Sequence, residues 1–399
     1  MPTGGESLRP ATGLPPMTGI AIDALPLQVR SAGVAVYVAE LVRGLAALLP
    51  NAELSLFGAA GRAVAGERAW PTNVRWQRRL AYPLVMGVPA GVPRLLTLES
   101  VLGQTELFHA TAYAAPRTRR IPVVLTVHDL TLLRHPELGT PGLRRTLRRV
   151  GADAARAHMV IADSQATQRD LTELCGVPPA RIRVVPLGVA PGFRPLPADS
   201  ARAQVRDRFR LAEPYLLHVG TLEPRKNLPR LIDAYAQLCR AGIAPPLLVL
   251  AGAPGWGADA VARAIDRHGL RERVVRLGRV DSAGLPALYA AAEAFVFLSL
   301  YEGFGLPVLE AMACGAAVVA ATTGALPEVA DDAALLVDPC DVDGLAGAMA
   351  RLLGDPGLRS RLRAAGPARA APFTWERTAG ATLAVYAEVL GRSLATAGP

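Results

Sequence analysis

Lys226 and the arginine before it are the first residues whose types suggest a particular chemistry. Lys226 is the only lysine among the 43 basic residues of this 399-residue chain. A compact ammonium and a planar guanidinium are not interchangeable against phosphate, so a single lysine beside an arginine can mark an anion-binding position. The alternative interpretation is a genome rich in arginine codons that leaves one lysine by chance.

Glu302 and Glu310 form a second candidate group, because they flank the short run Gly-Phe-Gly-Leu-Pro. The glycines permit a tight turn whose backbone N–H groups can approach a ligand closely. Pro307 suits the first turn of a helix, and a helix N-terminus attracts anions. A carboxylate among apolar residues needs hydrogen-bond donors, which a sugar or ribose diol can supply. Taken singly, Glu302 could also be a solvated loop residue, and Glu310 a helix-edge glutamate.

Short apolar runs alternate with helical patterns along nearly the whole chain. In the first half they predict strands near residues 20–23, 54–57, 107–109, 122–127, 159–162 and 182–185. In the second half they predict strands near residues 215–219, 247–251, 274–277, 295–298, 317–320 and 334–337. Helices are predicted between them, for instance at residues 34–48, 228–239, 283–292 and 306–313. Short buried strands with intervening helices predict an α/β protein with parallel sheets covered on both faces.

These elements place the candidate residues at the ends of strands. Arg225 and Lys226 follow the run at 215–219, and Glu302 follows the run at 295–298. His128 and Asp129 follow the run at 122–127. Because open α/β sheets bind ligands at the carboxyl ends of their strands, all of these side chains are candidates for one type of site.

The length of the chain predicts two domains, since 399 residues exceed one ordinary core. A proline-rich stretch at residues 186–197 is the best candidate for the connection. We predict a flexible tail at 1–17, an N-terminal domain at 18–190, a linker at 191–212, a C-terminal domain at 213–370, and a final helix and tail at 371–399.

The motifs together resemble a known family. The pair Glu302 and Glu310, with seven residues between them that begin Gly-Phe-Gly, resembles the signature of retaining GT-B glycosyltransferases of family four. Residues 220–227, Gly-Thr-Leu-Glu-Pro-Arg-Lys-Asn, look like the donor-phosphate loop of the same family. Further similar segments lie at residues 127–130, 162–164, 185–188, 322–324 and 325–329. The resemblance therefore covers nearly the whole chain.

This resemblance implies both a fold and roles for individual residues. The fold would be two Rossmann-like domains with parallel sheets facing across a cleft, and a C-terminal helix returning to the N-terminal domain. Arg225 and Lys226 would neutralise the donor diphosphate. Glu310 would bind the ribose, and Glu302 the hydroxyls of the transferred sugar.

The remaining donor contacts implied by the family come from backbone and loop residues. The donor-phosphate loop begins at Gly220. The backbone of Phe304, Gly305 and Leu306 would meet the sugar and the phosphate. Arg279 and Val280, after the predicted strand at 274–277, would border the base pocket.

In the first half, the resemblance gives His128 a contact near the transferred sugar. Asp129 either fixes the tautomer of that histidine or caps a turn. Gly33 resembles the glycine loop on the acceptor side of the family, although only one glycine stands where two are common. An ordinary helix start explains the segment around Gly33 equally well.

Charge and cysteine content limit the partners. The four cysteines are widely spaced and form no C-x-x-C pair, which predicts neither a disulfide framework nor a metal site and agrees with a cytoplasmic protein. Residues 1–190 hold 21 arginines and 13 acidic residues, so they carry +8 of the net +9. Arg144, Arg145, Arg148 and Arg149 could form a basic helix face that rests on an anionic membrane at its cytoplasmic side. The alternative is a solvated helix face, and no nucleic-acid motif accompanies the charge.

We therefore expect a retaining hexosyltransferase that uses a nucleotide sugar. The segments around His128 and at residues 326–329 look most like mannosyltransferases of polysaccharide assembly, so GDP-mannose is the first donor to consider. A UDP-hexose or a dTDP-deoxysugar is the alternative donor, and the acceptor would be a glycan or a lipid-linked glycan. No metal or other cofactor is expected, because the cations with the helix N-terminus would replace a metal ion.

Other functions on the same fold remain open. A sugar-nucleotide epimerase would convert its nucleotide sugar without an acceptor. A phosphorylase would need a lysine for pyridoxal phosphate, and the only lysine lies in the phosphate loop. A nucleotide-sugar-binding or membrane-tethering protein would not need Glu302 for its function.

Overall fold

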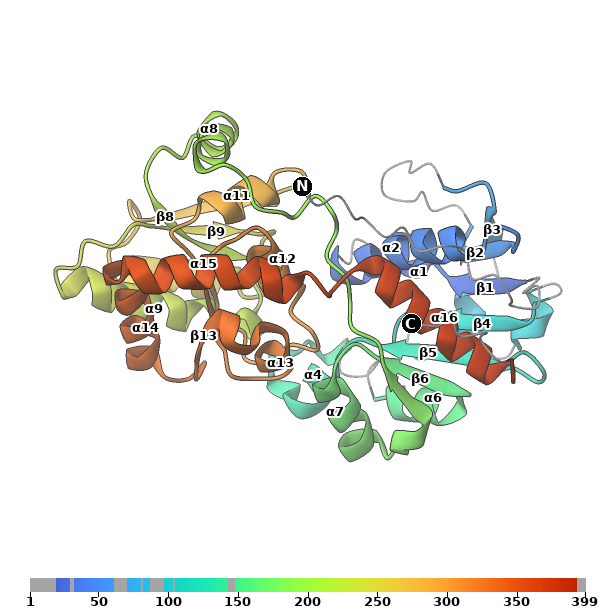
Figure 1. Ribbon diagram of the computed structural model, residues 1–399. Helices are drawn as coiled ribbons and strands as arrows, with labels where there is room; N and C mark the ends of the chain where they lie inside the picture. Colours follow the sequence, from blue (N-terminus) through green and yellow to red (C-terminus); the bar gives the residue numbers. More distant parts are fainter. Residues whose placement is uncertain are drawn as a thin grey trace. The chain divides into compact units, whose positions relative to one another are not determined.

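The chain divides into two units, each built around a parallel sheet (Figure 1). The first comprises Met1–Gly188 with Trp375–Pro399, and the second comprises Val189–Thr374. The structure is a computed structural model that describes residues 19–28, 32–60, 70–79, 82–86, 97–102, 105–142 and 148–392. The sheets and their flanking helices confirm the α/β, GT-B-like architecture predicted from the sequence.

The sheet of the first unit has strand order β3-β2-β1-β4-β5-β6-β7, and all of its pairings are parallel. Its strands are β1 (Ile20–Asp23), β2 (Leu54–Ala59), β3 (Val74–Arg79), β4 (Leu107–Ala110), β5 (Val123–Val127), β6 (Met159–Ala162) and β7 (Ile182–Val184). Strands β1, β4, β5 and β6 are buried at every position, because helices cover both faces of the sheet.

The helices of the first unit are mostly short. They are α1 (Leu25–Gln28), α2 (Ala32–Leu48), α3 (Tyr82–Met86), α4 (Thr131–Arg134), α6 (Val150–Arg156), α7 (Gln165–Cys175) and α16 (Trp375–Val389), with the 3-10 turns η1 (Leu98–Ser100), η2 (Pro136–Leu138) and η3 (Pro179–Arg181).

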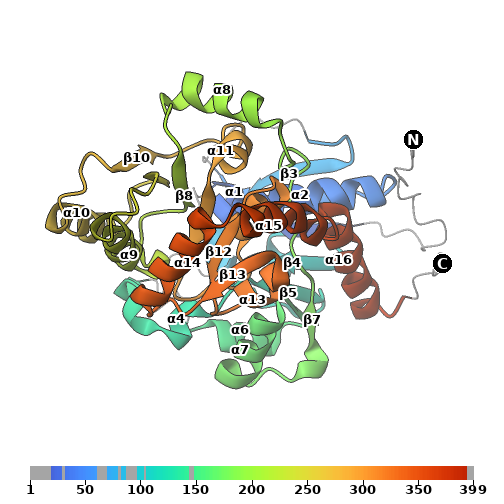
Figure 2. The ribbon, with the colours of Figure 1, turned by 60° about the vertical axis from the view of Figure 1, so that its left-hand side comes forward.

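The C-terminal helix α16 packs against α2, as Figure 2 shows. A Cβ added to Gly44 of α2 would lie 2.6 Å from the Cβ of Ala379, so the two helices approach closely at this glycine. The prediction that the last helix returns to the N-terminal unit is therefore confirmed.

The sheet of the second unit has strand order β10-β9-β8-β11-β12-β13, again all parallel. Its strands are β8 (Tyr215–Val219), β9 (Leu247–Ala251), β10 (Val274–Gly278), β11 (Ala294–Phe297), β12 (Val318–Ala321) and β13 (Ala334–Val337). Its helices are α8 (Ala198–Phe209), α9 (Leu228–Arg240), α10 (Ala258–Arg267), α11 (Leu285–Ala291), α12 (Leu306–Ala313), α13 (Leu326–Ala330), α14 (Val342–Gly354) and α15 (Pro356–Ala370), with the 3-10 turns η4 (Pro224–Lys226) and η5 (Asp331–Ala333).

One core of the second unit lies under α9, α10 and α14. Alternate strand residues such as Leu216, Leu248 and Val296 meet Leu231 of α9 and Leu345 of α14 there, all nearly or fully buried. On another side of the unit, α12 packs against α11 and α15. This packing holds the carboxyl ends of β8 and β11 in place, and the loops that leave them carry the candidate residues.

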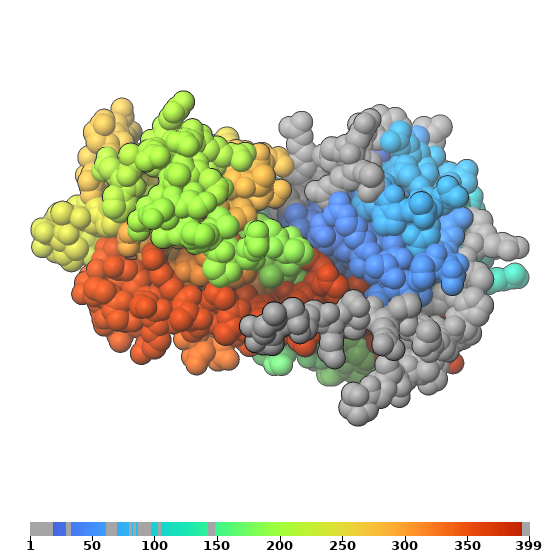
Figure 3. Space-filling model, turned by 45° about the horizontal axis from the view of Figure 1, so that its top comes forward, coloured from blue at the N-terminus to red at the C-terminus, as the bar shows by residue number. Residues whose placement is uncertain are grey.

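Two features of the structure differ from the sequence expectations: one additional strand, and the place where the second unit begins. The strand β3 was not predicted, because its sequence Val-Arg-Trp-Gln-Arg-Arg lacks an apolar run. Residues 191–212, expected to be a linker, lie within the second unit and include α8, which packs against α11. Figure 3 shows α8 (light green) on the surface of that unit, and its outward polar residues explain why its sequence suggested a linker.

Candidate active site

The loop after β8 carries Arg225 and Lys226 on the 3-10 turn η4. It begins at Gly220, whose φ of +156° is a conformation that side chains other than hydrogen rarely adopt. A Cβ at Gly220 would also lie 3.3 Å from Nε2 of His218 and from Cε of Lys226. A glycine is therefore needed where the chain leaves the strand and turns under the lysine side chain.

A second loop, after β9, packs against the loop of residues 220–227 (the donor loop). A Cβ at Gly252 would lie 1.8 Å from the carbonyl oxygen of Gly220, and one at Gly257 would lie 3.0 Å from that of Leu222. The amide of Leu222 donates to Ala253 O (3.0 Å), and that of Gly257 donates to Leu222 O (3.0 Å). The glycines of residues 252–257, which do not fit a dinucleotide fingerprint, instead let the two backbones pack against each other.

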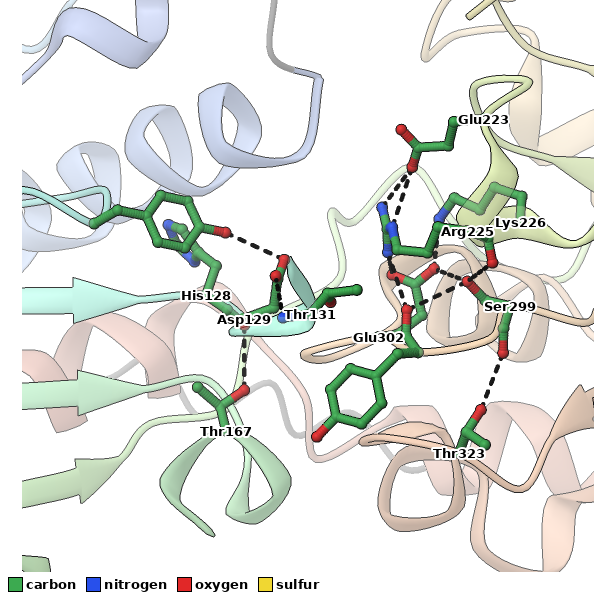
Figure 4. A network of polar contacts seen from close by, with 12 residues as sticks. His128, Asp129, Thr131, Thr167, Glu223, Arg225, Lys226, Ser299, Glu302 and Thr323 are labelled. Atoms are coloured by element: carbon green, nitrogen blue, oxygen red, sulfur yellow. Dashed lines mark hydrogen bonds and ion pairs between the residues drawn. The ribbon is translucent and has the colours of Figure 1, made fainter. Parts of the chain in front are cut away.

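Glu302 forms ion pairs with both Arg225 and Lys226 of the donor loop, although 76 residues separate it from Lys226. Lys226 Nζ donates to Glu302 Oε1 at 2.5 Å, and Arg225 forms an ion pair with the other carboxylate oxygen. Ser299, which follows β11 closely, donates its hydroxyl to the same carboxylate. Figure 4 shows Arg225, Lys226 and Ser299 all pointing toward Glu302. The arrangement is a buried carboxylate saturated with donors.

Arg225 is oriented by contacts on its other side. Its Nη2 and Nε donate to Glu223 Oε1 at 2.8 and 3.1 Å. Its carbonyl oxygen accepts the amide of Leu300 at 2.8 Å, which ties the donor loop to the loop after β11. The guanidinium is thus held between two carboxylates.

The backbone of Glu302 is held by the loop after β12. A Cβ at Gly324 would lie 2.3 Å from the carbonyl oxygen of Glu302, and Gly324 has a φ of +61°. The amide of Ala325 donates to that same carbonyl at 2.9 Å, and Thr323 donates its hydroxyl to Ser299 O at 3.0 Å. The similarity to the family at residues 322–329 therefore corresponds to a loop that supports Glu302.

Burial and charge together shift the ionisation of this group. Burial alone would raise the pKa of Glu302, but the positive charges of Arg225 and Lys226 lower it to about 2. Burial, together with the charge of Arg225, lowers the pKa of Lys226, while Glu302 opposes that shift. The Lys226 ammonium also lies 4.7 Å from the ring centre of Phe297, a cation–π contact.

Helix α12 begins beside this group at Gly305, whose φ is +100°. A Cβ there would lie 2.5 Å from Leu326 Cδ2, so the turn before the helix requires glycine. Phe304 is buried and Leu306 is half-buried at the start of the helix. The N-terminus of α12 carries the partial positive charge of the helix dipole, which attracts anions.

Glu310 lies in the middle of α12 and has a different environment from Glu302. Tyr289 of α11 donates its hydroxyl to Glu310 Oε2 at 3.0 Å. Burial raises the pKa of Glu310 to about 7, and the tyrosine bond lowers it only in part. Glu310 can therefore gain or lose a proton near neutral pH. The other predicted donor residues of this unit, Arg279 and Val280, follow β10 and are exposed and half-buried, respectively.

The predicted residues of the first unit gather at the carboxyl end of β5. His128 Nδ1 lies 2.7 Å from Asp163 Oδ2, and Nε2 lies 2.9 Å from the carbonyl oxygen of Thr111. A carbonyl oxygen only accepts, so Nε2 carries a proton. Burial alone would lower the pKa of His128, but the neighbouring Asp163 carboxylate raises it. Both ring nitrogens are thus occupied, and a sugar hydroxyl reaches one of them only if a bond opens.

Asp129 does not contact the ring nitrogens of His128. Its Oδ1 accepts the amide of Thr131 at 3.0 Å at the start of α4, and its Oδ2 accepts the hydroxyl of Tyr113 at 3.1 Å. The tautomer of His128 is instead determined by Asp163 and Thr111, so of the two predicted roles of Asp129 the capping of a turn agrees with this geometry.

Gly33 lies exposed in the first turn of α2, with no atom within 4 Å of an added Cβ. Arg148 is exposed and Arg149 half-buried just before α6, whereas Arg144 and Arg145 lie outside the described residues.

Several residues of these sites were not predicted as site residues. Asp163, Ser299, Gly252 and Gly324 act through contacts with residues that are distant in sequence. Asp23, at the carboxyl end of β1, is fully buried, accepts the hydroxyl of Tyr82 at 2.9 Å, and has its pKa raised to about 6 by burial. Its position directly after an apolar run is the signal that could have identified it.

Across the described residues, no helix is both long enough and apolar enough to span a bilayer.

Comparison with known protein families matches both halves of the chain. Residues 31–193 match "Glycosyltransferase Family 4", and residues 201–369 match "Glycosyl transferases group 1". The O-antigen chain mannosyltransferase B of Escherichia coli is 35% identical over 284 residues, which cover 70% of this chain and 74% of that protein. The serotype-specific mannosyltransferase WbdA of the same species is 31% identical over 261 residues, and the matched part spans about a third (32%) of its length.

Solved structures share the fold over nearly the whole chain. Sucrose-phosphate synthase from Thermosynechococcus elongatus superposes with a TM-score of 0.75 at 24% identity, covering 94% of this chain and all (100%) of that one. HepE from Anabaena, in complex with UDP and glucose, gives 0.72 at 22% identity, covering 93% of this chain and 99% of that one. With the two parallel-sheet units and the match to the mannosyltransferase of Escherichia coli, these similarities show that the chain belongs to glycosyltransferase family 4 and is a hexosyltransferase of the GT-B type.

Proposed function

We propose that this enzyme transfers a mannosyl group from GDP-mannose to a glycan or lipid-linked glycan, with retention of the anomeric configuration. The observation that carries the proposal is the group of Arg225, Lys226 and Glu302 beside the N-terminus of α12. The similarity to two mannosyltransferases supports mannose as the transferred sugar.

The cations and the helix N-terminus supply the leaving-group stabilisation. As the bond between the sugar and the diphosphate breaks, negative charge grows on the phosphate oxygens. Glu302 is the anion that holds Arg225 and Lys226 in place. A diphosphate bound beside them draws on the same two cations, while the Glu302 carboxylate gains acceptor capacity for sugar hydroxyls. Glu310 would accept the ribose hydroxyls once it is ionised.

The assay that tests this function offers GDP-mannose, UDP-glucose and a dTDP-deoxysugar in turn, with free and lipid-linked glycans. Of the three donors, we expect only GDP-mannose to give a glycosylated acceptor, and we expect Glu302→Ala to abolish that product. HepE, whose structure contains UDP and glucose, has the same fold and makes a UDP-hexose the alternative donor. Turnover of a nucleotide sugar without any acceptor would instead identify an epimerase. If the cellular function of the protein persists in Glu302→Ala, the protein is a binding or tethering protein and not an enzyme.

We also propose that transfer needs no divalent metal, because Arg225, Lys226 and the start of α12 would supply the positive charge. Turnover should be unchanged in excess chelator. Complete loss that added Mg²⁺ or Mn²⁺ restores would contradict this part of the proposal.

A further inference from the structure

A basic pocket lies at the edge of the first unit's sheet opposite to His128. It is a cavity of about 410 Å³. Its lining includes Arg117, Arg119, Arg120, Arg156, Thr118 and His158. These residues precede β5 and β6 or end α6, whereas His128 follows β5. A five-residue strand spans about 17 Å, so the basic pocket is separate from the candidate sugar site of this unit.

The loop that carries three of these arginines has a defined conformation. Oε1 of Glu99 accepts the hydroxyl of Thr118 at 2.6 Å and the amides of Arg119 and Arg120 at 2.7 and 2.8 Å. The hydroxyl of Thr118 also lies 2.8 Å from Ile121 O. Because one carboxylate gathers the backbone of the loop, the arginine side chains extend from a fixed base, not from a free surface turn.

The positive charge of the basic pocket is not neutralised by the acidic residues that the structure describes around it. Glu99 is engaged with the loop backbone, and Asp153 forms an ion pair with Arg156 and accepts the amide of Ala115. No carboxylate among the described residues forms an ion pair with the guanidinium of Arg117, Arg119 or Arg120, and no Asp or Glu among them lines the cavity. Three exposed arginines thus line one cavity without a counterion in the described part of the chain.

His158 adds a donor of known orientation. Its Nδ1 accepts the amide of Val123 at 3.1 Å, so the proton of the neutral ring is on Nε2. In either protonation state Nε2 therefore presents an N–H group. The side chains of the pocket that are free to bind a ligand are guanidinium and imidazole donors, which complement a group that only accepts hydrogen bonds.

We propose that the basic pocket binds a phosphate-bearing anion, either a phosphate monoester or a diphosphate. Guanidinium groups match phosphate oxygens in paired hydrogen bonds, and several together give charge as well as geometry. A volume of about 410 Å³ also admits the group to which the phosphate is attached. The site would hold the anionic part of a soluble ligand or a lipid headgroup, away from the sugar-transfer residues.

Histidine side-chain NMR of the full chain tests the proposal directly, because the chain has six histidines and His158 is one of them. Inorganic phosphate and pyrophosphate are titrated, and the His158 signal is assigned with His158→Gln. We expect a saturable shift of His158, with an apparent Kd at least about tenfold weaker in the double variant Arg119→Gln, Arg120→Gln. The matched control Arg169→Gln, an exposed arginine of α7 in the same unit, should bind like the wild type.

The donor site also attracts diphosphate, and a Lys226→Ala variant separates the two. The His158 response should remain in Lys226→Ala, so the basic pocket stands or falls independently of the proposed mannosyl transfer. Thermal unfolding of each variant verifies that it is folded. A His158 signal that does not move, or that moves equally in the double variant and the control, would overturn the proposal.

Vesicles distinguish the two sources of phosphate. Co-sedimentation with phosphatidic acid but not phosphatidylcholine, lost in the double variant, would identify a lipid headgroup as the ligand. Binding of soluble phosphate without vesicle binding would identify a soluble phosphate ester. Binding of neither kind would refute the site.

Discussion

At the residue scale, the chemistry of the second unit depends on a buried carboxylate with two cations against it. Lys226 is only 6% exposed and Glu302 7% exposed, so neither charge is held by water. A buried ion pair is stable only when its remaining hydrogen-bonding capacity is satisfied, as Ser299 does here for Glu302. Removing Glu302 leaves the Lys226 ammonium buried without its counterion, whereas removing Lys226 leaves Glu302 with Arg225 as its partner.

Lys226→Ala should therefore lower kcat by about 10²- to 10³-fold, the usual effect of deleting one donor to a developing anion. Lys226→Arg should restore little, because the side chain of Lys226 lies close against Gly220 and its ammonium lies 4.7 Å from the centre of the Phe297 ring. A bulkier guanidinium would have to displace one of these neighbours. Steady-state kinetics of both variants measures this. If arginine serves equally well, the single lysine of the chain reflects codon use and not phosphate chemistry.

Glu310 predicts a pH dependence of donor binding. With its pKa raised to about 7, the carboxylate accepts ribose hydroxyls fully only above that pH. The kcat/KM for the donor should fall as pH decreases below about 7, approaching about tenfold per pH unit. Glu310→Gln should have a lower kcat/KM and no such fall between pH 6 and 8.

The same shift also affects stability. The folded chain keeps a proton on Glu310 that the unfolded chain loses above the ordinary glutamate pKa of 4.5, so this residue makes folding less favourable as pH rises from 4.5 to about 7. Urea unfolding at several pH values should show that this part of the slope is absent in Glu310→Gln.

At the element scale, four loops of the second unit, those after β8, β9, β11 and β12, meet in two pairs through glycines. The loop after β9 packs on the donor loop through Gly252, and the loop after β12 packs on Glu302 through Gly324. These contacts are between backbones, so a single methyl group cannot be accommodated by a change of rotamer.

Gly252→Ala should destabilise the second unit by about 1–3 kcal/mol or more and lower kcat/KM for the donor, because its Cβ would lie 1.8 Å from Gly220 O. Gly347→Ala in α14 is the matched control, since nothing lies within 4 Å of its Cβ. That substitution should leave activity intact and raise the free energy of unfolding by about 0.5–1 kcal/mol at most, because alanine favours a helix interior over glycine. Equal effects of the two would contradict the backbone packing described here.

Most of the strands and helices could be predicted from the sequence, and there are physical reasons why the others could not. Strands buried on both faces, such as β5 and β9, are continuous apolar runs and were predicted within a residue or two. The strand β3 was missed because it lies at the edge of its sheet, where arginines alternate with Val74 and Trp76. The Glu302 motif was recognisable, but its contact with Lys226 depends on tertiary structure, as does the pairing of Asp163 with His128.

At the scale of the whole molecule, the two units differ in how the chain completes them. The second is continuous in sequence, whereas the first needs the C-terminal helix α16. Tyr386 of α16 is fully buried, and its hydroxyl lies 2.6 Å from His109 Nδ1, while Thr126 holds the other ring nitrogen. Burial lowers the pKa of His109 to about 3, so this histidine is neutral and needs both partners.

Tyr386→Phe should cost the first unit about 1–3 kcal/mol, since it leaves a buried ring nitrogen without a partner. Tyr235→Phe in α9 is the comparison in the second unit, because its hydroxyl donates to Pro246 O at 2.7 Å. Calorimetry should show that each substitution lowers the transition of its own unit. If Tyr386→Phe acts on the second unit instead, the assignment of α16 is wrong.

Retaining mannosyl transfer is tested by following with NMR the reaction of the wild-type enzyme with ¹³C-labelled GDP-mannose and a glycan acceptor. We expect an α-mannoside that retains the configuration of the donor, formed only when acceptor is present, and absent with Lys226→Ala or Glu302→Ala. A β-mannoside, or a nucleotide sugar altered without any acceptor, would contradict the proposed transfer.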